Sequence, residues 1–460
     1  MEAVALSPSP RSQSPEKLPR KLGFWPLVAA TFFMVSGGAY GTEDIVHGAG
    51  YAGAILVLLI TPVLWSLPTA LMIGELASAV PADGGFYVWV RRGMGRFWGF
   101  QEAWLSLAAS IFDMAIYPTL FVVYLTRLFP WFGVWPRGWL MALALVATCA
   151  LLNICGIRVV SQTSLWLFVL LSAPFAVVTV YALARHGAFV GAGAGASATH
   201  NVGLLTGILV VMWNYMGWDN ASTIAADVEH PQRTYPRAIL AAIGIVALSY
   251  IVPIAAMSVT GITPAAWDTG AWADLAALIA GPWLRVALVA GGMFSAFGMF
   301  NALVMSYSRL PLALAQDGML PRILAKKWRR TQAPWVAIVV LAACWGASLN
   351  LGFERLVTID IFVYGLSLLL EFAALVALRL REPQLARPFR VPGGLIGAVA
   401  LGIFPALLLA LSVLRGERER IAGMSSLEFG LLLAAAGVAV YALGLGRARH
   451  ALRQAQPAGD

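Results

Sequence analysis

The sequence predicts an all-α integral membrane protein with about twelve transmembrane helices. Of its 460 residues, 60% are hydrophobic and only 12% are charged, and the mean hydropathy is +0.79. Soluble domains are roughly half apolar and about a quarter charged. Apolar stretches of about 20 residues, each long enough to cross roughly 30 Å of hydrocarbon, recur along almost the whole chain. This composition excludes a soluble globular protein.

The distribution of basic residues supports this span count. With the N-terminus inside, most of the 31 Lys and Arg residues, Arg91 and Arg92 among them, fall on the cytoplasmic side, as the positive-inside rule requires. We therefore assign the net charge of +9 to membrane topology and not to nucleic-acid binding. We expect a multi-pass protein of the plasma membrane with both termini cytoplasmic. The predicted spans are 24–47, 53–79, 97–126, 138–155, 163–184, 203–228, 236–260, 283–310, 334–351, 355–378, 394–414 and 427–446.

The first span contains a defect at "MVSGGAYGTEDIV", residues 34–46. Two adjacent glycines, a third at Gly41 and two carboxylates, Glu43 and Asp44, interrupt an otherwise apolar helix. Because glycine weakens a helix, we predict that the chain unwinds over residues 36–41. The alternative is that the glycines only permit close helix packing, which is common in membranes.

The sixth span carries the same defect at "WNYMGWDN", residues 213–220, where Asn214, Gly217 and Asp219 fall deepest in the bilayer. Four complete spans separate the two breaks. The unit that begins with each break therefore holds five spans, and the second unit must be inverted relative to the first. Two interrupted helices at matching positions of inverted halves indicate the binding site of a secondary transporter. The sequence thus predicts a five-plus-five inverted repeat with discontinuous helices 1 and 6.

This organisation sets the expected domain boundaries. The first segment is rich in Ser and Pro and lacks an apolar core, which is typical of a disordered tail and not of a signal peptide. We expect a cytoplasmic tail over 1–21, a transporter core with helix 11 over 22–415 that contains repeats at about 22–184 and 203–380, a loop and helix 12 over 416–448, and a cytoplasmic tail over 449–460.

Unwound backbone in a membrane is tolerated only where it lines a cavity or meets a ligand. The start of the half-helix after each break attracts an anion such as a carboxylate, whereas freed carbonyls suit an ammonium group or a metal cation. Trp218 could add an aromatic wall for a cation. We therefore expect the substrate to bind between the two breaks.

Buried carboxylates are a second functional signal, since an Asp at the bilayer centre costs roughly 2.5–3.5 kcal/mol. Glu43 and Asp219 stand at the predicted breaks, where either could hold a substrate ammonium or a proton coupled to transport. Asp113 precedes Tyr117 by one helical turn and shares its face, so it either lines the cavity or bonds a neighbouring span. Glu75 lies close to basic residues of the following loop and fits a structural ion pair.

Several segments together resemble the amino acid–polyamine–organocation superfamily, and within it the polyamine/L-type amino acid transporter branch. The resemblance runs from about residue 22 to 415. It rests on "MVSGGAYGTEDIVHGAG", "PADGGFYVWVRRGMGRFWGFQEAW", "WNYMGWDNASTIAADVEHPQRTYPRAI", "RLPLALAQDGMLP" and "LLEFAALVALRLREPQLARPFRVPGG", in that order.

The resemblance implies a substrate site between the unwound parts of spans 1 and 6, flanked by spans 3, 8 and 10. Many relatives are driven by protons. The lysine that some bacterial relatives place in the fifth span is absent here, so coupling would have to use a carboxylate such as Glu43. The candidate substrate-binding residues are Ser36, Gly37, Gly38 and Gly41 in span 1, Asp113 in span 3, and Trp213, Asn214, Gly217, Trp218 and Asp219 in span 6.

We therefore expect a secondary active transporter, a proton-coupled symporter that moves amino acids and/or polyamines by alternating access. Its partners would be an amine-bearing solute, a proton as the coupling cation, and the lipid bilayer. The alternatives are a non-transporting nutrient receptor or a channel on the same fold. We expect no catalytic residue, metal or cofactor, and thus no enzyme, because the three cysteines and five histidines show no ligand or nucleophile spacing.

Overall fold

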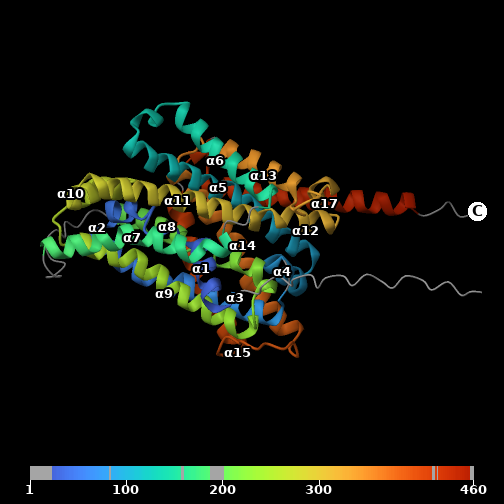
Figure 1. Cartoon of the computed structure of the whole chain (residues 1–460). Helices are drawn as coiled ribbons and strands as arrows, with labels where there is room; N and C mark the ends of the chain where they lie inside the picture. The colour runs from blue at the N-terminus through green and yellow to red at the C-terminus, as the bar shows by residue number, and fades with distance from the viewer. Residues whose placement is uncertain are drawn as a thin grey trace, which may run out of the picture.

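The structure, a computed structural model, describes residues 23–81, 84–156, 160–186, 201–416, 420–421 and 423–455. Over these residues the chain is a bundle of long helices (Figure 1). The described strands are β1 (Arg420–Ile421) and β2 (Met424–Ser425), which form one short antiparallel ribbon. The all-α fold class is confirmed, while the predicted tail of residues 1–21 lies outside the described residues.

Eight helical stretches in the described part of the chain are long and apolar enough to cross a bilayer. The other four predicted crossings are the two interrupted helices and the shorter described apolar parts of α7 (Val160–His186) and α13 (Trp335–Ser348). The eight are α2 (Glu43–Thr61) continued by η1 (Pro62–Ser66) and α3 (Leu67–Ala79), α5 (Arg96–Leu128), α6 (Arg137–Ile154), α9 (Pro231–Met257), α11 (Pro282–Tyr307) with α12 (Arg309–Gln316), α14 (Phe353–Arg381), α15 (Gly394–Leu401) with α16 (Ile403–Gly416), and α17 (Ser426–Ala455).

The first span is broken where the sequence predicts. Helix α1 (Phe24–Val35) ends before Ser36, and α2 begins only at Glu43. Within α2, Gly50 also leaves helical geometry. It separates the second half of the first span from the start of the second span. The glycines therefore do more than permit close packing, because the backbone leaves helical geometry.

The sixth span is broken between α8 (Asn201–Asn214) and η3 (Trp218–Asp227). The sequence predicts a second α-helical half here, but η3 is a 3₁₀ helix of 10 residues. Runs of 3₁₀ helix longer than about four residues are uncommon, and such stretches often mark hinges. Gly217 at the break has a φ of +86°, a left-handed conformation that suits glycine.

Short helices cover the two ends of the bundle (Figure 1). They are α4 (Gly85–Met94), η2 (Pro130–Gly133), η4 (Pro264–Ala266), α10 (Trp272–Ala280) and η5 (Arg322–Ala325). Helices α4 and α12 lie at the same end as the C-terminus, and α10 lies at the opposite end. We call these the α4 end and the α10 end. Helix α17 continues to Ala455, beyond the predicted end of helix 12.

Helices α5 and α14 pack against each other at the centre and run antiparallel. Near the end of α14, the Arg381 guanidinium donates to the backbone carbonyl of Gly93, just before α5 begins (2.8 Å). Each of these two helices contributes acids to the interior, Glu102 and Asp113 from α5, Asp360 and Glu371 from α14. Their mutual packing thus brings buried charge to the middle of the molecule.

Glu75 of α3 forms a buried ion pair. Its two oxygens accept hydrogen bonds from Arg379 on α14 at 2.8 and 2.5 Å, and Arg387 lies 3.4 Å away. The expected ion pair is confirmed, but its partners follow the tenth span, whereas the nearer Arg91 and Arg92 bind other acids. The pair ties two helices far apart in sequence.

We predict that Glu75→Gln destabilises the protein by about 3–5 kcal/mol, because the charge of Arg379 is left buried without its partner. Thermal unfolding in detergent measures this. Glu382→Gln is the control: Glu382 pairs with Arg92 near the surface, worth less than about 1 kcal/mol. The hydrogen bond from Arg92 lowers the pKa of Glu382, so the control substitution removes a full charge at neutral pH. Equal losses would contradict the importance of the buried pair.

Candidate functional site

A cavity of about 40 Å³ lies between the two helix breaks. Both breaks and four continuous helices, α5, α9, α11 and α14, supply its walls. The lining residues are Met34, Val35, Gly37, Tyr40, Asp113, Tyr117, Leu120, Tyr124, Trp213, Asn214, Met216, Gly217, Asn220, Tyr250, Gly292, Ser295, Ala296, Met299, Tyr307, Asp360 and Tyr364.

Side chains from other helices bind the carbonyls freed at the first break. The Ser295 hydroxyl donates to the Gly37 carbonyl (2.7 Å), and the indole N–H of Trp272 donates to the Ala39 carbonyl (2.9 Å). The amide of Asn214 donates to the Gly41 carbonyl at 3.3 Å. Because unpaired carbonyls are costly inside a membrane, these donors from α11, α10 and α8 stabilise the unwound segment.

The second break is bound in the same way. The Tyr250 hydroxyl donates to the Asn214 carbonyl (2.9 Å), and the Gly217 N–H donates to the Tyr364 hydroxyl (3.3 Å). A Cβ at Gly217 would lie only 2.9 Å from the Met34 carbonyl oxygen, so the two breaks meet backbone to backbone. Only glycine combines this approach with the left-handed φ.

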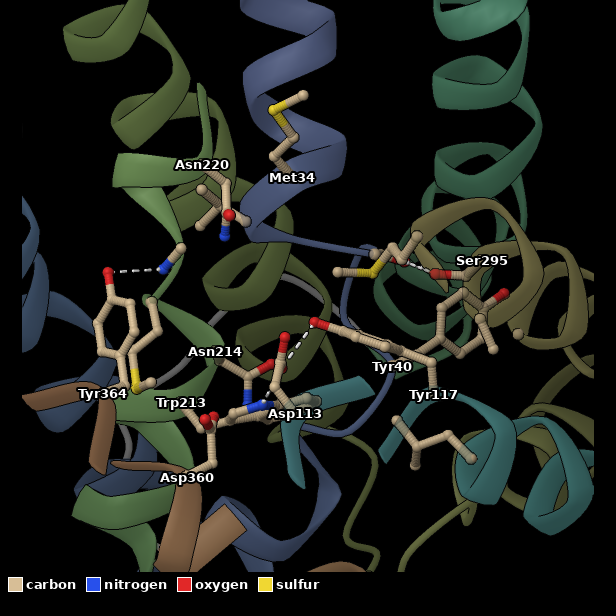
Figure 2. Close-up of a pocket in the computed structure, with 18 of the residues that line it drawn as sticks. Met34, Tyr40, Asp113, Tyr117, Trp213, Asn214, Asn220, Ser295, Asp360 and Tyr364 are labelled. Carbon is tan, nitrogen blue, oxygen red and sulfur yellow. Dashed lines mark hydrogen bonds between the residues drawn. The ribbon is translucent and has the colours of Figure 1, made fainter. Parts of the chain in front are cut away.

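Asp113 is held inside the cavity by neutral donors. One carboxylate oxygen accepts from the Tyr117 hydroxyl (3.0 Å) and the Trp213 indole (3.4 Å), and the other accepts from the Tyr307 hydroxyl (3.3 Å). Figure 2 shows Asp113 next to Tyr117 and Trp213. These bonds fix the orientation of the carboxylate without neutralising its charge.

Asp360 brings a second carboxylate to the same cavity (Figure 2). One of its oxygens has no hydrogen-bond partner among the described residues. The lining contains six tyrosines and Trp213, and no Lys, Arg or His. Two acids, a set of aromatic rings and no basic side chain make a cavity that favours a cation.

Some of the predicted substrate-binding residues line the cavity, and others are buried outside its lining. Those in the lining are Gly37, Asp113, Trp213, Asn214 and Gly217. Those outside it, though buried, are Ser36, Gly38, Gly41, Trp218 and Asp219.

The residues outside the lining support the ones inside. The Ser36 hydroxyl accepts the Gly38 N–H (3.1 Å), and Trp218 donates to the Tyr215 carbonyl (2.8 Å). Asp219 accepts a hydrogen bond from the cavity residue Tyr364 at 2.5 Å. These contacts hold the two breaks in shape.

Glu43, the predicted proton carrier, lies behind the cavity wall. It is fully buried at the start of α2 and accepts a hydrogen bond from the Tyr124 hydroxyl. Tyr124 itself lines the cavity. The other oxygen of Glu43 has no partner among the described side chains. One tyrosine therefore connects this acid to the substrate space.

Sequence reasoning missed Asp360, although a signal was present. Asp360 precedes Tyr364 by four residues, the same spacing that singled out Asp113 and Tyr117. This spacing places an acid and a tyrosine on one helix face. The two pairs come from antiparallel helices and meet at the cavity. A search for this repeated Asp-x-x-x-Tyr pattern would have identified the second acid.

These features define a membrane transporter with a central binding cavity between two interrupted helices. A profile described as amino acid permease matches residues 27–419, and the chain belongs to that family. This confirms the resemblance to the amino acid–polyamine–organocation superfamily and its polyamine/L-type branch. The chain is thus a multi-pass transporter of the amino acid permease family.

Curated relatives and one solved structure agree with this assignment. The chain is 35% identical over 423 residues to "Polyamine transporter PUT1" of Oryza sativa subsp. japonica, covering 90% of this chain and 78% of the relative. It is 33% identical over 425 residues to "Polyamine transporter RMV1" of Arabidopsis thaliana, covering 90% and 84%. The structure of MhsT in complex with L-phenylalanine has a TM-score of 0.60 at 15% identity, covering 86% of this chain and 99% of MhsT. That likeness supports the fold alone.

We predict that Gly37→Ala reduces transport strongly. The added methyl group would overlap the Ser295 hydroxyl and lie 2.7 Å from the Met299 sulfur, so Ser295 would have to give up its hydrogen bond to the Gly37 carbonyl and Met299 would have to shift. Initial uptake of radiolabelled putrescine into proteoliposomes, at equal protein content, is the measurement. Gly244→Ala on α9 is the matched control, since its methyl group would meet nothing within 4 Å. Normal uptake by the Gly37 variant would mean that the break tolerates displacement.

Proposed function

We propose that the protein is a secondary active transporter of amine-bearing solutes, a proton-coupled symporter that works by alternating access. The observation that carries this proposal is the cavity with two carboxylates, Asp113 and Asp360, and no basic residue in its lining. A buried acid is expensive in a membrane unless a partner neutralises it. A protonated amine entering the cavity supplies that partner.

Among amines, a polyamine fits this charge pattern best. A diamine carries two positive charges, which the two acids can balance, while the tyrosine and tryptophan rings contact the carbon chain and the ammonium groups. The curated relatives named above as polyamine transporters support the same choice. A neutral amino acid would place only one ammonium group here, and its carboxylate would face two acids.

Alternating access is supported by ion pairs that join helices at both ends of the bundle. At the α10 end, Arg127 binds Asp268 and Asp274 at 2.8 and 2.7 Å. At the α4 end, Arg91 binds Asp317, and the neighbouring Arg92 binds Glu382. A cavity of about 40 Å³ holds only a few water-sized groups. Substrate entry therefore requires the walls to move apart at one end at a time.

Coupling to a proton is proposed through Glu43. Among the described residues, one oxygen of its buried carboxyl group has no hydrogen-bond partner, and the other is bonded to the cavity residue Tyr124. Protonation would remove the unpaired charge and change the hydrogen bond to the cavity wall. We further propose a plasma-membrane protein with both termini cytoplasmic, inverted repeats at about 22–184 and 203–380, and a role as neither enzyme, channel nor nutrient receptor.

We predict that Asp113→Asn and Asp360→Asn each lower putrescine uptake about tenfold or more, since each removes a charge-assisted contact worth about 1.5–3 kcal/mol. Radiolabelled putrescine uptake, with competition by unlabelled leucine, is the measurement. Glu428→Gln serves as the control, because Glu428 is exposed and Gln can still accept the Ser425 N–H. Full competition by leucine, with both Asn variants unaffected, would favour a neutral amino acid instead.

We predict that Glu43→Gln abolishes accumulation driven by a pH gradient and leaves expression intact. Glutamine keeps the hydrogen bond to Tyr124 but cannot exchange a proton. Accumulation of labelled substrate is compared with and without the pH gradient, and a sodium gradient is applied separately. Wild-type accumulation by the variant would remove Glu43 from the coupling mechanism, and uptake driven only by sodium would exclude proton coupling.

A further inference from the structure

A second pair of buried acids lies away from the cavity. Glu102 on α5 and Glu371 on α14 are both 0% exposed. One oxygen of Glu102 and both oxygens of Glu371 have no hydrogen-bond partner in the part of the chain that the structure describes. Burying an ionised carboxylate without a partner is far more costly than burying a neutral acid. The substrate cavity does not account for these two side chains.

The two acids lie at the same depth in the bundle. Glu102 precedes Asp113, and Glu371 follows Asp360, by the same number of residues, about three helical turns or roughly 16 Å. Because α5 and α14 are antiparallel and Asp113 and Asp360 meet at the cavity, both spacings lead toward the α4 end. Glu102 and Glu371 therefore lie at the same level, about three turns from the substrate cavity, and close enough to interact electrostatically.

Buried hydroxyl groups lie between the cavity and this pair. On α14, Tyr364 and Ser367 occupy the same helix face as Glu371, and all three are buried. On α5, the Ser106 hydroxyl donates to Glu102 at 2.8 Å. Hydroxyl groups both donate and accept hydrogen bonds, so they can pass a proton between acids.

Asp219 on η3 connects the cavity to the pair. It accepts the hydrogen bond of Tyr364, and its charge is close enough to interact with Glu102 and Glu371. The hydroxyl of Tyr235 on α9 is fully buried beside Asp219 and has no partner among the described groups. An unpartnered donor at this place is a second, independent sign of an unfilled polar site.

The charged groups on neighbouring elements are engaged elsewhere. Arg379 of α14 is bonded to Glu75 of α3, and the arginines of α4 bind Asp317 and Glu382. The described side chains of α8, α13 and α16 carry no charge. On α17, Tyr441 packs its ring against Phe97 and Phe100. No basic side chain in the described ranges forms an ion pair with Glu102 or Glu371.

A proton is the ligand that fits the pair. The described residues include no group of three or more His, Cys, Asp and Glu suited to a metal ion. Neither Glu102 nor Glu371 lines the cavity, so a substrate amine bound in the cavity does not contact them. A proton needs no space, and it turns one carboxylate into a donor that can bond the other.

We infer that Glu102 and Glu371 form a proton-binding site, separate from the substrate cavity, that exchanges protons with Asp219 on the way to the α4 end. In each transfer one proton leaves a carboxylic acid O–H and binds a carboxylate oxygen, and the donor becomes anionic. No electron moves. The inference rests on the proposed function, in which Glu43 serves the α10 side.

The test uses the full-length protein in proteoliposomes. Glu102→Gln, Glu371→Gln and the exposed control Glu428→Gln are compared with wild type, and Glu371→Asp tests rescue. Accumulation of labelled putrescine under a pH gradient is measured beside putrescine counterflow without any gradient. We expect accumulation to fall to the equilibrium level in both Gln variants, with counterflow close to wild type, and to recover in part in Glu371→Asp.

Other outcomes overturn the inference. Undiminished accumulation in both Gln variants would exclude the site, although the proposed function would stand. Equal loss of counterflow and accumulation, without rescue by Glu371→Asp, would give the acids a structural role only. Loss of a sodium-driven component alone would identify a metal cation in place of the proton. A wild type that shows no putrescine counterflow would overturn the proposed function itself.

Discussion

The structure depends on how backbone groups find partners where no water is present. Two helices give up their regular hydrogen bonds near mid-bundle, and the carbonyls of Gly37, Ala39, Gly41 and Asn214 are bonded by side chains from other helices. The donors Ser295, Trp272, Asn214 and Tyr250 therefore hold the breaks open without a ligand. Because these donors come from four different elements, the position of each break is fixed by the packing of the whole bundle.

The second organising feature is negative charge placed where arginine and lysine are absent. Around the cavity, tyrosine hydroxyls take the place of cations as partners for the acids. A hydroxyl stabilises a carboxylate without cancelling its charge, so the attraction for an incoming cation remains. Near the α4 end, by contrast, two arginines neutralise the acid Glu75, which therefore has a structural role. Buried carboxylates thus have two different roles, which depend on their neighbours.

Much of the fold followed from the sequence, because membrane crossings depend on length and hydrophobicity alone. The two breaks were located from Gly37, Gly38 and Gly217, because glycines beside polar residues deep in an apolar span favour a backbone that leaves the helix. The 3₁₀ geometry of η3 was not predictable, since local sequence does not distinguish it from an α-helix. The sequence also did not indicate which acids line the cavity. Asp219 and Asp360 stand on different helices, and the packing of these helices decides which of the two lines it.

The 3₁₀ pitch of η3 has a mechanical consequence. Ten residues rise about 20 Å as a 3₁₀ helix and about 15 Å as an α-helix. Rewinding this one segment as an α-helix would shorten it by about 5 Å, close to one α-helical turn, so the residues at one of its ends would have to move. The segment begins directly after Gly217, which lines the cavity, so its contraction would displace residues of the cavity wall. A change of helix type in η3 would therefore move part of the cavity wall.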